Sequence, residues 1–185
     1  FTELKASLEQ QLQESLHQKN NLTIILDEAG HHIQYQDMDY SLNYQDHEFQ
    51  KLLDNSKHPL IQAIGTKKRQ QKILDACAGL GKDGFILAHA GHDITSCELH
   101  PILFSLLEQA IGKTVKKESL NWTAVHDNCQ NLMRPGLFDI IYLDPMFSAA
   151  SKAKPKLMMQ IVQQLAPKDP FTFWEIAWKS TRDRL

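Results

Sequence analysis

The chain has 185 residues, enough for one domain with a substantial hydrophobic core and too few for two domains of ordinary size. Hydrophobic residues make up 42% of it and charged residues 23%, which excludes intrinsic disorder, collagen-like repeats and coiled coils. Because 20 Lys and Arg face 22 Asp and Glu, the formal net charge is −2. A nucleic-acid partner would therefore have to be bound by local basic patches.

Cysteine and histidine usage argues against structural disulfides and metal sites. The three cysteines form no CxxC pair, and the nine histidines come without an HExxH motif or a Cys/His framework. We therefore expect a reducing compartment and no bound metal. No apolar run reaches the roughly 18 residues that would span a bilayer, and no signal-peptide core is present, so we expect a cytoplasmic protein without a membrane partner.

The first third of the chain predicts a small accessory lobe. Leucines four residues apart over 1–18 predict an amphipathic surface helix. Two apolar runs, 22–26 and 33–36, flank a short polar segment with Gly30 and predict a β-hairpin. Residues 37–57 are polar and only weakly periodic, so we expect a loop with one helix near 46–54. We assign 1–57 to this lobe and expect changes in it to leave cofactor binding intact.

From residue 58 onward, strand and helix patterns alternate at the spacing of α/β proteins. The sequence HPLIQAIG predicts a short helix with Pro59 in its first turn and Gly65 after its end. Strands are expected at 72–76, 93–97, 122–126 and 138–143. Helices are expected from the glycine-bearing loop to about 90, at 101–111, near 129–133, at 156–165 and at 171–182. This pattern predicts one domain over 58–185 with a doubly wound, mostly parallel sheet and a ligand crevice at the carboxyl ends of the strands.

A glycine-bearing loop follows the first of these strands. Gly79-x-Gly81-x-x-Gly84 is literally the GxGxxG pattern of dinucleotide-binding proteins. Here, however, Asp75 ends the strand and three small residues precede Gly79. The arrangement DxxxGxG is typical of S-adenosylmethionine methyltransferases, in which a carboxylate near the loop suits the α-ammonium of the cofactor. An NAD-dependent oxidoreductase that uses the literal GxGxxG remains the alternative.

Two further acidic residues stand at the ends of predicted strands. Glu98 is placed to accept the two hydroxyls of a ribose, which suits NAD and S-adenosylmethionine alike. Asp127 is placed to accept the amino group of an adenine, although a solvated loop aspartate is an equal alternative.

The last predicted strand runs directly into Asp144-Pro145-Met146-Phe147. Pro145 fixes a turn, Asp144 offers an acceptor for an exocyclic amine, and Phe147 offers a flat apolar face for a base. The turn resembles the [N/D]PP[Y/F] signature of methyltransferases that act on amino groups of nucleic-acid bases, with Met146 in place of the second proline.

The strings LDACAGLGKDGFILAHAGHDITSCELHP and IYLDPMFSAASKAK together resemble the ribosomal RNA small subunit methyltransferase J family over about residues 58–165. The resemblance implies a class I, Rossmann-like methyltransferase fold of seven strands, whose last strands we expect to lie beyond residue 185. It also implies S-adenosylmethionine as the cofactor, 16S ribosomal RNA or the small ribosomal subunit as the partner, and the N2 amino group of a guanine as the methyl acceptor. A non-catalytic nucleoside-binding or RNA-binding module of the same fold is the second alternative.

The resemblance assigns roles to individual residues. The catalytic residues it implies are Asp144, Pro145 and Phe147. The cofactor-binding residues are Asp75, Ala76, Gly79, Gly81, Lys82, Asp83, Glu98, Leu99, Asp127 and Asp144. The substrate-binding residues are Phe147, Lys152 and Lys154.

Overall fold

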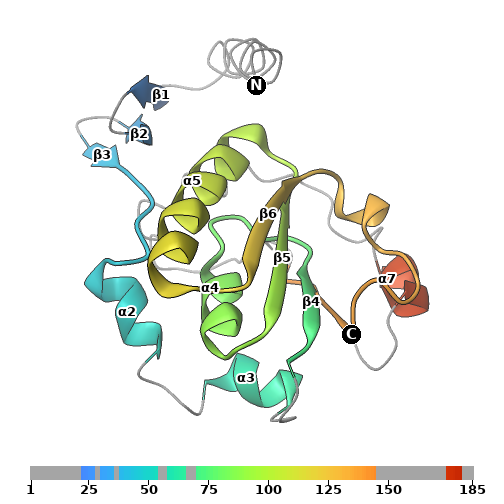
Figure 1. Ribbon diagram of the computed structural model, residues 1–185. Coiled ribbons are helices and arrows are strands. Elements are labelled where there is room, and N and C mark those ends of the chain that lie inside the picture. The colour runs from blue at the N-terminus through green and yellow to red at the C-terminus, as the bar shows by residue number, and fades with distance from the viewer. Residues whose placement is uncertain are drawn as a thin grey trace, which may run out of the picture.

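The computed structural model describes residues 22–27, 30–35, 38–53, 58–65, 70–144 and 174–180. Its centre is a parallel sheet of four strands in the order β6-β5-β4-β7 (Figure 1). This confirms the predicted α/β class and the four predicted strands. The strands are β4 (Lys72–Asp75), β5 (Asp93–Glu98), β6 (Trp122–His126) and β7 (Ile140–Tyr142).

The strand register brings the predicted motifs to one edge of the sheet. Asp75, the last residue of β4, pairs with Ser96 of β5 on one side and with Tyr142 of β7 on the other. Because parallel strands end at the same edge, the glycine loop after β4, Glu98 at the end of β5 and Asp144 after β7 lie on the same side.

Helices cover both faces of this sheet. Alternate residues of β4 enter two separate clusters of buried side chains: Ile73 packs with α4 (Lys82–His89) and α5 (Pro101–Glu118), whereas Leu74 packs with Ala177 of α7 (Trp174–Ser180). Cys129 of the short 3₁₀ helix η1 (Cys129–Asn131) also belongs to the second cluster. The result is a three-layer arrangement in which strand residues are buried on both sides.

Local sequence signals explain where the helices begin. His58 and His100 each accept a hydrogen bond at Nδ1 from the backbone N–H two residues on, which caps α3 (Pro59–Ile64) and α5. Each of these caps is followed by a proline, which has no N–H to leave unpaired. Helix α5 continues to Glu118, seven residues beyond the predicted end at Ile111, because Gly112 does not break it and it ends only where Ser119 adopts φ 53°.

The predicted hairpin is present as β1 (Leu22–Asp27) and β2 (Gly30–Tyr35), which pair antiparallel. A third strand, β3 (Met38–Tyr40), pairs with β2 where a loop was expected, so that prediction was wrong for these three residues. Three residues are too few for alternation to be visible in the sequence. Helix α2 (His47–Leu53) confirms the helix expected near 46–54.

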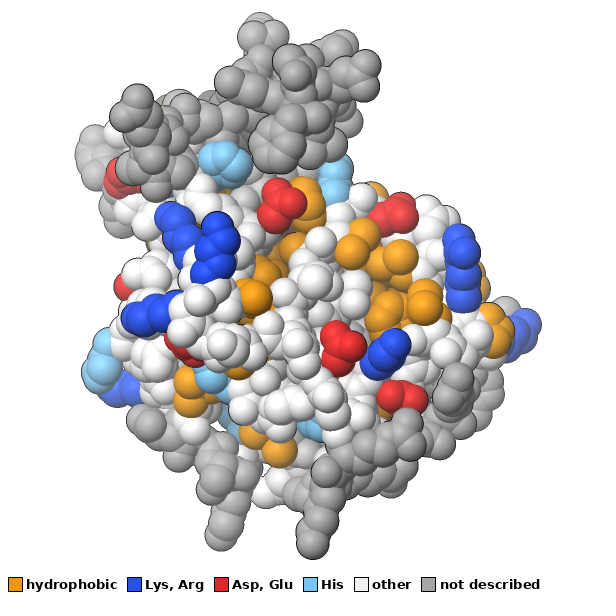
Figure 2. All heavy atoms as spheres, in the orientation of Figure 1, with side chains coloured by type: hydrophobic (Ala, Val, Ile, Leu, Met, Phe, Trp, Pro, Cys, Tyr) orange, Lys and Arg blue, Asp and Glu red, His pale blue; other side chains and the backbone are white. Residues whose placement is uncertain are grey.

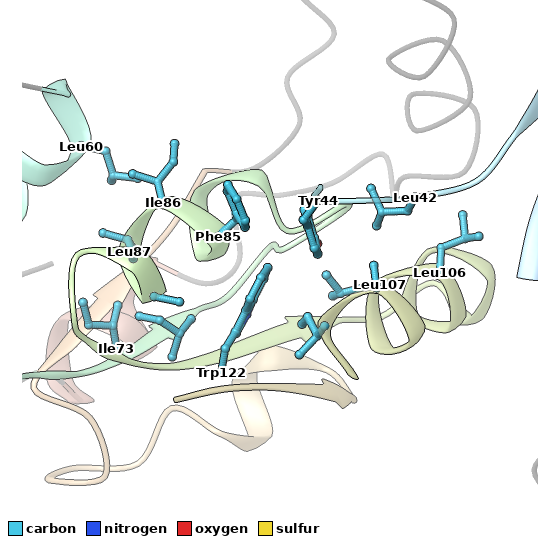
Figure 3. Close-up of a cluster of buried hydrophobic side chains, with 14 of the residues drawn as sticks. Leu42, Tyr44, Leu60, Ile73, Phe85, Ile86, Leu87, Leu106, Leu107 and Trp122 are labelled. Carbon is cyan, nitrogen blue, oxygen red and sulfur yellow. The ribbon is translucent and has the colours of Figure 1, made fainter. Parts of the chain in front are cut away.

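The segment that leads into α2 shares the main core with the sheet (Figure 3). Leu42 and Tyr44 are buried in the same cluster as Phe85 of α4 and Trp122 of β6, and Phe49 packs against it. The division at residue 57 stays a prediction, but this packing does not follow it. Side chains between 42 and 49 cannot be treated as remote from the glycine loop.

Several predicted features lie outside the described residues: the helix over 1–18, the helix over 156–165, and the expected absence of further strands before residue 185. Of the predicted helix over 171–182, residues 174–180 are described and are helical, as α7. Within the described ranges, no helix is long and apolar enough to cross a membrane.

Candidate active site

The first half of the loop between β4 and α4 is tied to the neighbouring strands on either side. Ala76 N–H donates to the Tyr142 carbonyl at 3.0 Å, and Ala78 N–H donates to the Cys97 carbonyl at 3.0 Å. Gly79 and Gly81 have φ values of 54° and 65°, in the left-handed region that favours glycine. The loop therefore has a defined shape, and it turns at Gly81 directly into the first turn of α4.

Gly84, the third glycine of the pattern, is required by packing. A Cβ on it would lie 2.6 Å from Ser96 Oγ and 3.1 Å from Asp75 Oδ2, both closer than normal contact. The third glycine thus lets α4 approach the sheet, which is the role of the last glycine in nucleotide-binding loops generally.

Asp75 lies underneath the loop. Its side chain is only 2% exposed, and Oδ2 accepts a hydrogen bond from the Ser96 hydroxyl at 3.0 Å. The same hydroxyl oxygen accepts from the Trp122 indole N–H at 2.9 Å. Burial, together with the nearby carboxylate of Asp83, raises the pKa of Asp75 to about 7, although the hydrogen bond from Ser96 opposes this. The predicted contact of Asp75 with an ammonium group stays a prediction, since the carboxyl is covered in this arrangement.

Stability is expected to depend on the ionisation of Asp75. An aspartate in the unfolded chain loses its proton near pH 4, whereas in the folded protein Asp75 keeps it up to about pH 7. The folded state therefore binds the extra proton in this window, and the free energy of unfolding should fall as pH rises from 4 to 7. Asp75→Asn should remove this pH dependence. Its free energy of unfolding, relative to that of wild type, should therefore rise by on the order of 1 kcal/mol or more from pH 5 to pH 8. Urea unfolding of both proteins at the two pH values measures it; an equal pH dependence would contradict it.

Glu98 ends β5 and is 6% exposed. Its Oε2 accepts from Gly79 N–H at 2.8 Å and its Oε1 from His100 N–H at 2.7 Å. Burial raises the pKa of Glu98, and the two backbone N–H groups oppose that effect. Both carboxylate oxygens are thus already engaged, so the two ribose hydroxyls predicted for Glu98 would have to share them with these N–H groups or displace them. The neighbouring Leu99 is 47% exposed, an apolar surface beside the glycine loop.

A second group of polar side chains joins the start of α4 to the end of β7. The Tyr142 hydroxyl donates to Asp83 Oδ2 at 2.8 Å. Asp144, two residues beyond Tyr142, is exposed. Partial burial and the charge of Asp83 raise the pKa of Asp144, while Lys82 lowers it. The structure therefore brings Lys82, Asp83 and Asp144 together, and their roles stay predictions.

Asp127 follows β6 and is bound within its own loop. Its Oδ1 accepts from Asn128 N–H at 2.7 Å and from Asn131 Nδ2 at 2.8 Å, across η1. Of the two interpretations of Asp127, these contacts favour a structural loop aspartate, and its role toward adenine stays a prediction. The remaining predicted site residues, Pro145, Phe147, Lys152 and Lys154, lie outside the described residues.

Four residues with a place around the site were not singled out for it from the sequence: Tyr44, Ser96, Trp122 and Tyr142. Tyr44 hydrogen-bonds the glycine loop, whereas Ser96 and Tyr142 hydrogen-bond the predicted residues Asp75 and Asp83. Trp122 hydrogen-bonds Ser96. Only Tyr142 had a visible signal, because it stands two residues before Asp144 in the sequence. The others depend on contacts between residues 21 to 36 positions apart, which no local pattern records.

Other features of the described residues do not compete with this site. No group of three or more His, Cys, Asp or Glu among them could hold a metal ion. A polar cavity of about 260 Å³ lies at the opposite, amino-terminal edge of the sheet, lined by Gln71, Asp93 and Asp139 among others. The predicted motifs thus lie at the carboxyl-terminal edge of the sheet, and this cavity lies at the other edge.

Comparison with known proteins supports the same interpretation. The sequence model of a family described as "Putative SAM-dependent methyltransferase" matches residues 2–185. A solved SAM-dependent methyltransferase from Neisseria gonorrhoeae aligns with a TM-score of 0.65 over 89% of this chain and 69% of its own, at 18% identity. At that identity the likeness shows the class I fold alone.

Relatives with curated names point to one kind of enzyme. "Ribosomal RNA small subunit methyltransferase J" of Buchnera aphidicola is 36% identical over 120 residues, 60% of this chain and 48% of that protein. The protein of the same name from Francisella tularensis subsp. novicida is 31% identical over 162 residues, 82% of this chain and 67% of its own length. The chain spans about half the length of the first of these relatives. The match over 2–185 shows that the chain belongs to the SAM-dependent methyltransferase family, and the Francisella protein places it with the methyltransferase J proteins of that family.

Proposed function

We propose that the protein transfers a methyl group from S-adenosylmethionine to the N2 amino group of a guanine in 16S ribosomal RNA, as a cytoplasmic enzyme. The observation that carries this proposal is the placement of Asp144 beside Lys82 and Asp83, at the edge where the glycine loop and Glu98 also lie. A site for a nucleoside cofactor and a candidate acceptor for an amine thus adjoin each other.

The residues present fit S-adenosylmethionine by their chemistry. Glu98 offers carboxylate oxygens to a ribose, which would share them with Gly79 N–H and His100 N–H or displace these groups. Exposed Leu99 offers an apolar surface for an adenine. Gly81 supplies no side-chain cap to α4, which leaves the first-turn N–H groups available to a carboxylate. The partly exposed carboxylate of Asp83 suits an α-ammonium, whereas Asp75, predicted for this contact, is covered in this arrangement. When bound, S-adenosylmethionine supplies an electrophilic methyl group carried on sulfur.

Asp144 has the central chemical role in this proposal. The lone pair of guanine N2 is delocalised into the ring, so the amino group needs alignment and help with the positive charge that develops on it. The carboxylate of Asp144 would accept one N–H of the amine, hold it in place, and take up the surplus proton when the new C–N bond forms. Phe147 would stack on the base, and Lys152 and Lys154 would contact phosphates.

Two assays test the proposed function. Calorimetric titration with S-adenosylmethionine and with NAD is expected to show binding of the former only. Incubation of the protein with undermethylated small ribosomal subunits or 16S rRNA and labelled S-adenosylmethionine should place label on guanine N2. Binding of NAD would favour an oxidoreductase, whereas cofactor binding with no transfer to either RNA substrate would favour a non-catalytic binding module.

RNA binding is expected to weaken with salt less steeply than for a strongly basic protein. The net charge is −2, and Figure 2 shows acidic and basic side chains interspersed, with a basic group over the end of α5, where Lys113, Lys116 and Lys117 are exposed. Such local contacts predict a log–log slope of about −2 to −4. Measuring the binding constant for a 16S rRNA fragment across a series of salt concentrations gives this slope. A slope of about −9, the value for roughly ten phosphates, would contradict the prediction.

A further inference from the structure

The carbonyl of Leu80, in the glycine loop, accepts a hydrogen bond from a residue that lies far away in the sequence. Leu80 lies between Gly79 and Gly81, both at positive φ, so local sterics do little to fix the direction of its carbonyl. The neighbouring N–H groups are fixed by Glu98 Oε2, which accepts from Gly79, and by the Ala78 carbonyl, which accepts from Gly81 at 2.7 Å. The carbonyl of Leu80 itself accepts a hydrogen bond from the Tyr44 hydroxyl at 2.8 Å, across 36 positions of sequence.

The ring of Tyr44 is held rigidly by other aromatic rings. Tyr44 is 1% exposed. It stacks on Phe85 with 5.0 Å between centroids and 14° between planes, meets Phe49 edge-on at 4.9 Å, and lies 5.0 Å from Trp122 (Figure 3). Burial and the charge of Asp75 raise the pKa of the Tyr44 hydroxyl well above its ordinary value, so it stays protonated and able to donate.

A tight turn before α2 presents this side chain. Asp46 N–H donates to the Asn43 carbonyl at 3.2 Å, and Asn43 Nδ2 donates to Asp46 Oδ1 at 2.7 Å. Gln50 Nε2 donates to the Tyr44 carbonyl at 2.8 Å, and Gln45 bonds to Glu118 at the end of α5. The backbone of Tyr44 is thus anchored both within its turn and to the helix beside it.

The Tyr44 hydroxyl also lies close to Gly81. A Cβ at Gly81 would lie 2.5 Å from Tyr44 Oη and 3.1 Å from the Trp122 ring. The turn into α4 therefore passes directly against Tyr44. One aromatic side chain from the N-terminal third thus contacts the loop at the Leu80 carbonyl and at Gly81.

We propose that Tyr44 is a positioning residue for the cofactor loop, holding the Leu80 carbonyl so that Gly79, Gly81 and the start of α4 are set for S-adenosylmethionine. This rests on the proposed cofactor binding and deepens it. Loss of the hydroxyl leaves the ring packing in place and releases one backbone carbonyl. Cofactor binding would then have to order the loop, which lowers the affinity.

Tyr44→Phe, compared with Thr114→Val, tests the proposal. Thr114 is also buried, and its hydroxyl donates to the Ala110 carbonyl at 2.9 Å within α5, away from the loop. Each variant loses one buried hydroxyl-to-carbonyl hydrogen bond, so both should lose stability to a similar degree. Only Tyr44→Phe should weaken binding of S-adenosylhomocysteine, by about 3- to 10-fold, while Thr114→Val stays within about 1.5-fold of wild type. Calorimetry gives the binding constants and urea unfolding the stabilities.

Hydrogen exchange without ligand gives an independent readout. Exchange at the Gly81 amide should be faster in Tyr44→Phe than in Thr114→Val and wild type, because the loop opens more readily. If wild type fails to bind S-adenosylhomocysteine, the proposed function falls, and the exchange rates alone then decide the role of Tyr44. Unchanged exchange at Gly81 in Tyr44→Phe, or equal effects of the two variants on binding, would overturn the proposal.

Discussion

Replacing Asp144 by Ala is expected to lower methyl transfer by about 100-fold or more at saturating S-adenosylmethionine. The reason is that Asp144 is exposed at the end of β7 next to Lys82 and Asp83, where its carboxylate can reach an acceptor amine. Because this role concerns the acceptor amine, cofactor affinity should stay within about 3-fold of wild type. Single-turnover transfer to 16S rRNA and calorimetric titration measure the two quantities.

Asp144→Asn separates charge from shape in the same position. The amide keeps one acceptor oxygen and loses the negative charge that would relieve the charge developing on the amine. Transfer should therefore fall between wild type and Asp144→Ala. Normal turnover by Asp144→Ala would remove the catalytic assignment, and a parallel loss of cofactor affinity in both variants would move Asp144 into the cofactor site.

Replacing Glu98 by Ala should act on the cofactor. The change removes the acceptors of Gly79 N–H and His100 N–H and leaves both partly buried backbone groups without their partner. Hydrogen bonds to a charged group contribute about 1.5–3 kcal/mol, so affinity for S-adenosylmethionine should fall by about 10- to 100-fold. At saturating cofactor the transfer rate should stay close to wild type, because the contact is made before and during the reaction alike.

Glu108→Ala is the matched control for Glu98. Glu108 lies exposed on α5, and its removal takes away the same negative charge without touching the glycine loop. Cofactor titration of this variant should match wild type. An equal loss of affinity in Glu98→Ala and Glu108→Ala would show that net charge, not the contact with the loop, governs binding.

The glycine loop and the parallel strands could be predicted from sequence because their signals are local. Asp75 ends an apolar run, and Gly79 and Gly81 follow at short range. The alternation of strands with helices predicts that the strands run parallel. The register of β4 with β7 then places Asp144 near Asp83, as observed.

The support of the site could not be predicted in this way. Tyr44 lies in a polar, weakly periodic stretch of the sequence. Its proposed role depends on a contact with Leu80 that forms only in the folded chain. Likewise, a carboxylate at the end of β5 suggested a ribose ligand, whereas the engagement of Glu98 by Gly79 and His100 depends on how the loop folds back. Pattern gives residue type and strand end, but tertiary packing decides which atoms remain available.

The most direct test of the account is hydrogen exchange of wild type with and without S-adenosylhomocysteine. If the carboxyl ends of β4 and β5 hold the cofactor, the ligand should slow exchange at Gly79, Gly81, Leu99 and His100 while leaving Gln71, Asp93 and Asp139 at the opposite edge unchanged. Protection confined to that opposite edge, around its polar cavity, or no protection at saturating ligand, would contradict the assignment of the site.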